Sequence, residues 1–159
     1  MFKVGLVKIS KDLITIDESE ARKIAEDLRD KLNQIVIDEI IRRTNKIPGK
    51  PGLRFLRIEN KEFEIEKRYS KKDYWGISIV DHLLFKIPPE VMQETTRKDT
   101  QNFLLIHYNI DTWDLTKNYV GKEIRKFNTG RIDVGCFGIL DERKRDICKV
   151  TVWWSILIY

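Results

Sequence analysis

The sequence predicts an α+β domain in which a mainly antiparallel sheet packs against one long amphipathic helix. Three observations predict this class: a helical apolar pattern that ends in the Pro/Gly-rich segment 47–52, two-residue alternation over most of the remaining chain, and turn residues between the alternating stretches. The expected order of elements is β-β-α-β-β-β-β-α-β-β. A single domain is expected over residues 1–159, with a second short helix.

The long helix is expected to begin after Asp17 and to end at the Pro/Gly-rich segment. Asp17 and Glu20 have the spacing of a capping box, whose side chains satisfy free N–H groups in the first turn. The apolar residues recur at steps of three and four and form one stripe. They are Ala21, Ile24, Ala25, Leu28, Leu32, Ile35 and Val36. The stripe broadens at Ile37, Ile40 and Ile41, so either the rest of the domain or a neighbouring subunit is expected to cover the last turns on two sides.

The strands are assigned from alternation and from the turns that separate them. Residues 2–9 and 13–16 form one expected hairpin, and residues 53–58 and 62–69 form another around Asn60 and Lys61. Further strands are expected at residues 74–87, 102–110, 131–140 and 147–159, the last two joined by a charged turn at 141–146. Residues 90–101 predict an exposed loop, and residues 116–127 carry the apolar spacing of the second helix.

Composition narrows the class of protein. A chain of this length buries a core without disulfides or metals. Cys136 and Cys148 lack metal-ligand spacing and predict reduced core residues of an intracellular protein, with a disulfide across a hairpin as the alternative. No apolar run reaches the length of a signal-peptide core or a membrane span, so a soluble protein in the cytoplasm or in a virion is expected. The net charge of +5 comes from 30 basic and 25 acidic residues, which indicates a mixed surface and not a polybasic one.

Catalytic patterns are weak in this sequence. Asp133, Glu142 and Lys144 have the formal order of a metal-dependent nuclease site, as does Glu59 with Lys61, but both sets fall at expected turns and predict solvated charges. His82 and His107 are the only histidines, and no serine or cysteine is placed to pair with either. No catalytic residue, metal ligand or cofactor is therefore assigned.

Basic and aromatic residues alternate most densely between residues 67 and 75. Cations there would meet phosphates while aromatic rings stack on bases, as in proteins that bind single strands. The candidate nucleic-acid contacts are Lys67, Arg68, Lys71, Lys72, Tyr74 and Trp75. The alternative is that the aromatic residues are core residues beside a loop that lysines keep soluble.

The terminal strand predicts a protein interface, because Trp153 and Trp154 place one indole on each face of the sheet. The candidate interface residues are Ile37, Ile40, Ile41, Trp153, Trp154, Leu157 and Tyr159. Over residues 17–85, the order of helix, Pro/Gly turn, hairpin and strands resembles the small head-to-tail connector and tail-completion proteins of bacteriophages. This resemblance implies a virion component that multimerises.

The expected function is that of a non-enzymatic assembly protein, which forms homo-oligomers or joins other structural proteins. A nucleic-acid-binding protein or metal-dependent nuclease is the first alternative. A small accessory protein that inhibits a host enzyme is the second.

Overall fold

A computed structural model describes residues 16–71, 73–117, 122–127 and 130–159. The hairpin predicted at residues 2–9 and 13–16 lies outside these residues, apart from Ile16. No helix in the described ranges combines the length and the hydropathy that a bilayer-spanning segment needs.

Helix α2 spans Glu18–Thr44 and confirms the predicted long helix. The Asp17 carboxylate accepts a hydrogen bond of 2.8 Å from the Glu20 N–H, which is the predicted N-cap. The helix ends before the Pro/Gly-rich segment, where the Thr44 hydroxyl accepts a bond of 3.1 Å from the N–H of Leu53. Its buried apolar residues are Ala21, Ala25, Leu28, Leu32, Val36, Ile37 and Ile40.

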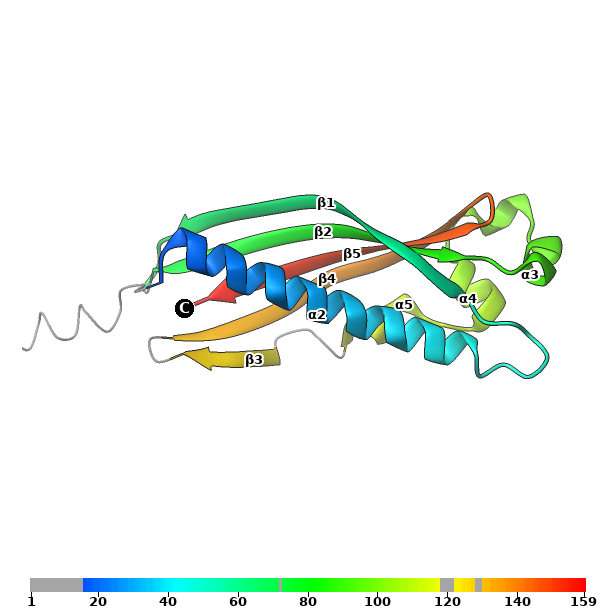
Figure 1. The fold of residues 1–159 in the computed structure, drawn as a ribbon, viewed down its shortest axis with the longest axis horizontal. Coiled ribbons are helices and arrows are strands. Elements are labelled where there is room, and N and C mark those ends of the chain that lie inside the picture. The colour runs from blue at the N-terminus through cyan, green and yellow to red at the C-terminus, as the bar shows by residue number, and fades with distance from the viewer. Residues whose placement is uncertain (1–15, 72, 118–121, 128–129) are drawn as a thin grey trace, which may run out of the picture.

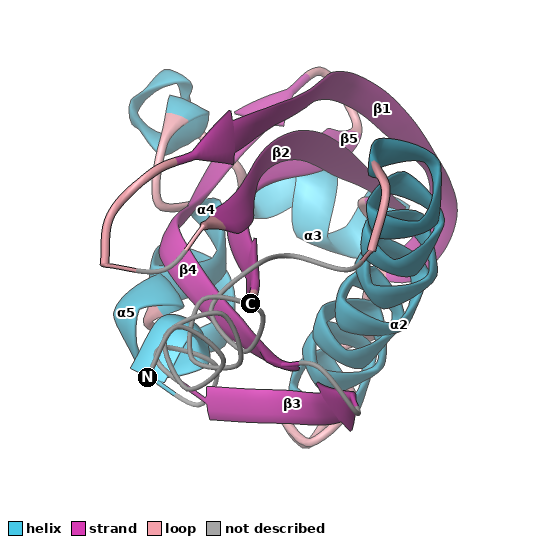
Figure 2. Ribbon diagram, turned by 90° about the vertical axis from the view of Figure 1, so that its left-hand side faces the viewer, coloured by secondary structure: helices cyan, strands magenta, loops and turns pink. Residues whose placement is uncertain are grey.

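Five strands form one antiparallel sheet in the order β1-β2-β5-β4-β3. They are β1 (Arg54–Arg68), β2 (Tyr74–Lys86), β3 (Lys122–Phe127), β4 (Gly130–Lys144) and β5 (Ile147–Ile158). The sheet curves around α2, which packs on its inner face (Figures 1 and 2). This arrangement confirms the predicted α+β class.

The central strand β5 alternates without interruption between the two faces of the sheet. Residues from Cys148 to Ile158 with even numbers are buried on the inner face, and their odd-numbered neighbours are half-buried on the outer face. Trp154 is 1% exposed and lies in the core, whereas Trp153 lies on the outer face. The predicted division of the two indoles between the faces is therefore correct.

The segment between β2 and β3 is helical where a strand was predicted. It contains α3 (Pro89–Glu94), a 3-10 turn (Arg97–Thr100), α4 (Phe103–Tyr108) and α5 (Thr112–Lys117). The strand predicted at 102–110 is wrong, because a short continuous apolar run does not distinguish a strand from a buried helix. The exposed loop predicted at 90–101 is corrected by α3 and the 3-10 turn, which occupy most of it. The helix predicted at 116–127 is also wrong, since residues 122–127 pair with β4 as strand β3.

One predicted turn lies within a continuous strand, and another is shorter than predicted. Residues 53–69 do not form a hairpin, because β1 passes through Asn60 and Lys61 with a bulge between Asn60 and Glu62. Strand β4 continues to Lys144, so the charged turn contracts to residues 145–146. Asp141, expected at that turn, is 5% exposed on the inner face.

Asp141 explains the start of α4. Its carboxylate accepts a hydrogen bond of 2.7 Å from the N–H of Leu104, in the first turn of that helix. Asn102 cannot supply the cap because it has a left-handed conformation, with a φ of 61°, and makes no side-chain cap bond. The cap of α4 therefore comes from a residue 37 positions away in the chain.

Replacing Asp141 with alanine is expected to lower the free energy of unfolding by about 1–2 kcal/mol, since the first turn of α4 loses its acceptor. Urea denaturation measures this change, and amide hydrogen exchange in residues 103–108 shows whether it is local. Asp114→Ala, at an exposed carboxylate of α5, is the control. Equal protection of α4 in both variants would contradict the capping role.

A buried polar network joins α2 to the sheet. The Asp81 carboxylate, fully buried on β2, accepts bonds from Arg29 Nε at 2.8 Å and from Arg29 Nη2 at 2.5 Å. Asn33 at 2.8 Å and Asn60 at 3.1 Å donate to the same carboxylate. The Trp154 indole N–H in turn donates to Asn33 Oδ1 at 2.7 Å. The bulge in β1 thus places Asn60 where it completes this network.

Candidate binding surface

The outer face of the sheet, opposite α2, carries side chains that a ligand or partner can reach. Strand pairing arranges them in rows, one residue from each strand. One row across the middle contains Glu62, Val80, Trp153 and Gly138. A row nearer the β4–β5 turn contains Arg57, Leu84, Lys149 and Glu142. The Trp153 ring and the cations Arg57 and Lys149 therefore lie at different positions along the strands of the same face.

A bulge in β4 creates the apolar part of this face. Cys136 pairs with Trp154 and Gly138 pairs with Trp153, which leaves Phe137 as the extra residue. The extra residue turns outward, and Phe137 is 79% exposed. Gly138 carries no side chain to cover the neighbouring Trp153 ring.

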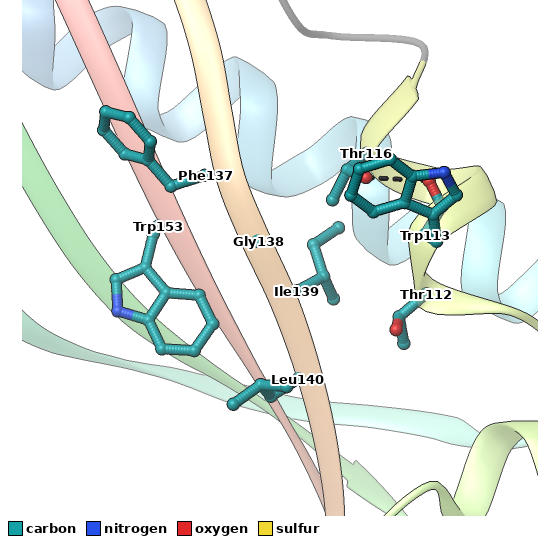
Figure 3. Close-up of a pocket in the computed structure, with 8 residues that line it drawn as sticks. All are labelled: Thr112, Trp113, Thr116, Phe137, Gly138, Ile139, Leu140 and Trp153. Atoms are coloured by element: carbon teal, nitrogen blue, oxygen red, sulfur yellow. Dashed lines mark hydrogen bonds between the residues drawn. The ribbon is translucent and has the colours of Figure 1, made fainter.

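The aromatic hollow lies over β4 between this bulge and helix α5 (Figure 3). Its volume is about 520 Å³. Phe137 and Trp153 lie on one side of β4 in this view, and Trp113 lies on the other (Figure 3). Trp113 is 67% exposed and Leu140 is 60% exposed. The lining residues are Thr112, Trp113, Thr116, Phe137, Gly138, Ile139, Leu140 and Trp153, none of which is charged.

Phe137 also borders a second, smaller hollow of about 320 Å³. This hollow continues along the outer face between β4 and β5 and is lined by Asp133, Gly135, Ser155 and Leu157 as well. The Phe137 ring is therefore a ridge with a hollow on either side. A surface of this shape offers both a projection and a recess.

A basic hollow of about 530 Å³ lies nearer the β4–β5 turn. Its cations come from β1, from the β4–β5 turn and from the strand residues on either side of that turn. The lining residues are Arg57, Glu59, Lys61, His82, Leu84, Lys144, Arg145, Ile147 and Lys149. Burial lowers the pKa of His82, and the positive charges of Lys149 and Lys61 lower it further. The imidazole of His82 is therefore protonated less readily than that of a solvent-exposed histidine.

The structure separates the residues predicted to contact nucleic acid. Trp75 is 9% exposed and its indole N–H donates to the carbonyl of Ile16 at 2.9 Å, so it belongs to the core. Lys67 and Arg68 are neighbours on β1 and point to opposite faces, and Tyr74 packs against Tyr159 with 5.8 Å between ring centroids. Lys71 is exposed beyond the end of β1. Lys72 lies outside the described residues.

The residues predicted to form a protein interface divide between the core and the outer face. Ile37, Ile40 and Trp154 are at most 1% exposed, and Ile41 packs partly buried against the core. Trp153, Leu157 and Tyr159 lie half-buried on the outer face. A partner can reach this second group and the exposed part of Ile41 without unfolding of the domain, whereas Ile37, Ile40 and Trp154 are closed to it.

The acidic residues weighed as a nuclease site lie on a strand and not at turns, which corrects their predicted position. Asp133 and Glu142 both lie on the outer face of β4, but they pair with Leu157 and Lys149 near opposite ends of β5. The Asp133 carboxylate lies 3.6 Å from Arg131, and the Glu142 carboxylate lies 2.5 Å from Lys149. Within the described ranges, no three His, Cys, Asp or Glu side chains gather in a way that would hold a metal ion.

The cysteines and the second histidine are packed within the fold. Cys136 and Cys148 are free and buried, and burial raises the pKa of both thiols. They do not face each other, because Cys136 pairs with Trp154 and Cys148 pairs with Arg143. His107 lies on α4, with its ring centroid 4.7 Å from that of Phe103.

The aromatic hollow and the basic hollow both depend on pairing between strands, which local sequence patterns do not show. The one local signal for the aromatic hollow is the segment Gly135-Cys136-Phe137-Gly138, where glycines inside a strand pattern indicate a bulge. The basic hollow has no such signal, since its cations come from separate strands. No protein-family model, curated protein or solved structure shows significant similarity to this chain.

Proposed function

We propose that the protein is a non-enzymatic assembly protein that multimerises through the aromatic hollow on the outer face of its sheet. The observation that carries this proposal is the exposure of Phe137, Trp113 and Leu140 around a recess without charged lining residues. Aromatic residues are enriched, and charged residues depleted, at the centres of protein interfaces. Exposed apolar groups gathered in one place on a sheet indicate a surface that a partner covers.

A second copy of the chain is the partner that this surface fits best. A two-fold contact joins the same patch on both subunits, so the patch has to be complementary to itself. The Phe137 ridge, with a hollow on either side, meets this condition because the ridge of each copy can enter a hollow of the other. The lining of the aromatic hollow is uncharged, which avoids repulsion between identical groups across the axis. The smaller hollow has one charged lining residue, Asp133, whose carboxylate lies 3.6 Å from Arg131.

Replacing Trp153 with glutamate is expected to weaken self-association by about 2 kcal/mol or more, which is roughly 30-fold, as for a residue at the centre of an interface. The wild-type protein is expected to sediment above the monomer mass of 18.9 kDa, and the variant at that mass. Analytical ultracentrifugation over a range of concentrations measures both. Phe137→Glu is expected to act in the same way without touching the core.

Ile35→Glu is the matched control, because Ile35 is an apolar residue of α2 that is 47% exposed and lies away from the outer face. It is expected to leave the association unchanged. Circular dichroism and the melting temperature of each variant establish that it is folded. A wild-type protein that remains at 18.9 kDa up to about 1 mM, the concentration range of the weakest specific contacts, would refute the proposal.

A place in a virus particle, as a head-to-tail connector or tail-completion protein, is the finer form of this proposal. Its support is the order of helix, Pro/Gly turn and strands. A two-fold contact alone closes at a dimer, so a ring requires a second, head-to-tail contact. Closed rings of the purified protein in electron micrographs would favour the place in a virus particle. A dimer that does not grow further would agree with the two-fold contact and argue against the finer proposal.

A further inference from the structure

The basic hollow concentrates positive charge on a protein whose surface is otherwise mixed. Five of its nine lining side chains are cationic, and Glu59 is the only carboxylate among them. Residues far apart in the chain bring this charge together: Arg57 and Lys61 from β1, and Lys144, Arg145 and Lys149 from the β4–β5 hairpin. The cluster is therefore a product of the fold.

Among the described residues, two of these cations lie beside a carboxylate and three do not. Lys149 lies 2.5 Å from Glu142, and Arg57 lies 3.6 Å from Glu59. Lys61, Lys144 and Arg145 form no ion pair with any carboxylate in the part of the chain that the structure describes. An anion that entered the hollow would meet cations that are free to bind it.

The size and lining of the hollow favour a phosphate-bearing ligand over a small inorganic anion. A volume of about 530 Å³ lies in the range of sites for organic ligands. Leu84 and Ile147 supply an apolar part of the lining, which a sugar or a base can contact. Arginine and lysine together are the side chains that proteins use for phosphate groups.

An exposed aromatic residue lies farther along the same face. On the outer face of β5, Thr151 separates Lys149 from Trp153. A single strand with its phosphates at the cations can extend toward the Trp153 ring, where a base stacks. A duplex cannot do so, because its bases are paired and stacked on one another.

We propose that the basic hollow binds the phosphate groups of a nucleotide or of a single-stranded nucleic acid. The phosphate site is separate from the surface proposed for self-association, since the basic and aromatic hollows share no lining residue. Only the stacking of a base on Trp153 falls on that surface. Either proposal can therefore fail while the other holds. The site also differs from the basic-aromatic stretch at 67–75.

Fluorescence anisotropy with a labelled oligothymidylate at low salt tests the proposal. Lys61→Glu combined with Lys144→Glu is expected to weaken binding at least tenfold. It is also expected to reduce the slope of log affinity against log salt by about 1.4, which corresponds to about 0.7 for each lost phosphate contact. Both lysines are exposed, and an unchanged melting temperature establishes that the variant is folded.

Lys67→Glu combined with Lys71→Glu is the matched control, with the same change of charge at two exposed lysines outside the hollow. It is expected to retain most of the affinity. Competition with ATP and with unlabelled oligonucleotide distinguishes the two sources of phosphate. Displacement by ATP at concentrations similar to the oligonucleotide indicates a nucleotide site, and much weaker displacement indicates a strand.

Three results would overturn the proposal. The first is an equal loss of binding in the control variant, which would indicate general attraction to a basic protein. The second is equal competition by polyglutamate, which carries negative charge without phosphate. The third is the absence of binding to both phosphate probes up to about 1 mM at low salt.

Discussion

Replacing Asp81 with alanine is expected to lower the free energy of unfolding by about 3–5 kcal/mol, the range for removal of one member of a buried ion pair. The loss leaves the Arg29 guanidinium, whose side chain is 11% exposed, without its counter-charge. Asn33 and Asn60 lose the acceptor that they share. Urea denaturation measures the change, and Glu64→Ala, at an exposed carboxylate of β1, is the control.

A double variant separates the ion pair from the packing around it. Asp81→Leu with Arg29→Met removes both charges and keeps apolar volume, so it is expected to be more stable than Asp81→Ala. A double variant as unstable as the single one would show that the two asparagines, and not the unpaired guanidinium, account for the loss.

The same network makes the stability of the protein depend on pH. Burial disfavours the ionised Asp81, but the hydrogen bonds from Arg29, Asn33 and Asn60 outweigh it and lower the pKa of this carboxyl below its ordinary value. Because the pKa of Asp81 is lower in the folded state than in the unfolded state, the ionised carboxylate stabilises the fold, and this stabilisation is at its full value at any pH above the ordinary pKa of aspartate. That stability is lost as the pH falls through the lowered value. Asp81→Ala is therefore expected to lose less stability than the wild-type protein between neutral and acid pH.

Trp154→Ala is expected to lower the free energy of unfolding by about 3–5 kcal/mol, whereas Trp153→Ala changes the stability of the monomer by about 1 kcal/mol or less. Trp154 is 1% exposed and its removal leaves a cavity beneath α2 as well as an unpaired Asn33 oxygen. Trp153 lies on the outer face of the same strand. Chemical denaturation at a concentration that keeps the protein monomeric measures both.

The two adjacent residues are matched in chemistry and differ only in the face that they occupy. Equal destabilisation by both variants would contradict the division of β5 into an inner and an outer face. Because Asn33 connects Trp154 to Asp81, the double variant Trp154→Ala with Asp81→Ala is expected to be less destabilised than the sum of the single changes.

The elements that the sequence predicts correctly are those whose signals are local and consistent. Asp17 caps α2 through a bond within one turn, and the period of α2 matches its contact with the sheet. On β5, two-residue alternation holds over the whole strand because both of its edges are paired and one face is covered. In both cases, burial and local preference favour the same structure.

The elements that the sequence does not predict are determined by distant residues. Helix α4 begins where Asp141 supplies an acceptor from β4, and β3 is a strand because β4 pairs with it. Asn60 has the local preference of a turn residue, yet it pairs with Asp81 in the sheet, next to the bulge, and its side-chain amide donates to the Asp81 carboxylate. None of these partners is visible within a short window of sequence.

The candidate binding surface was also predicted only where local patterns determine it. Alternation alone predicts that Trp153, Leu157 and Tyr159 share a face. The aromatic hollow also requires Phe137 and Trp113, which reach it through a strand bulge and a helix that the alternation did not indicate. The basic hollow requires the β1 bulge and the full length of β4.

Because Phe137 is the extra residue of the β4 bulge, the packing of the core does not depend on it. Cys136 and Gly138 already occupy consecutive places opposite Trp154 and Trp153, so a chain without Phe137 would continue as a regular strand. Every residue on the core side would keep its place. A single inserted residue can therefore add a projecting ring to this strand while the inward-facing residues keep their register, and the loss of strand pairing stays local to the bulge. A change of side chain at position 137 would therefore alter the outer surface without altering the packing of the core.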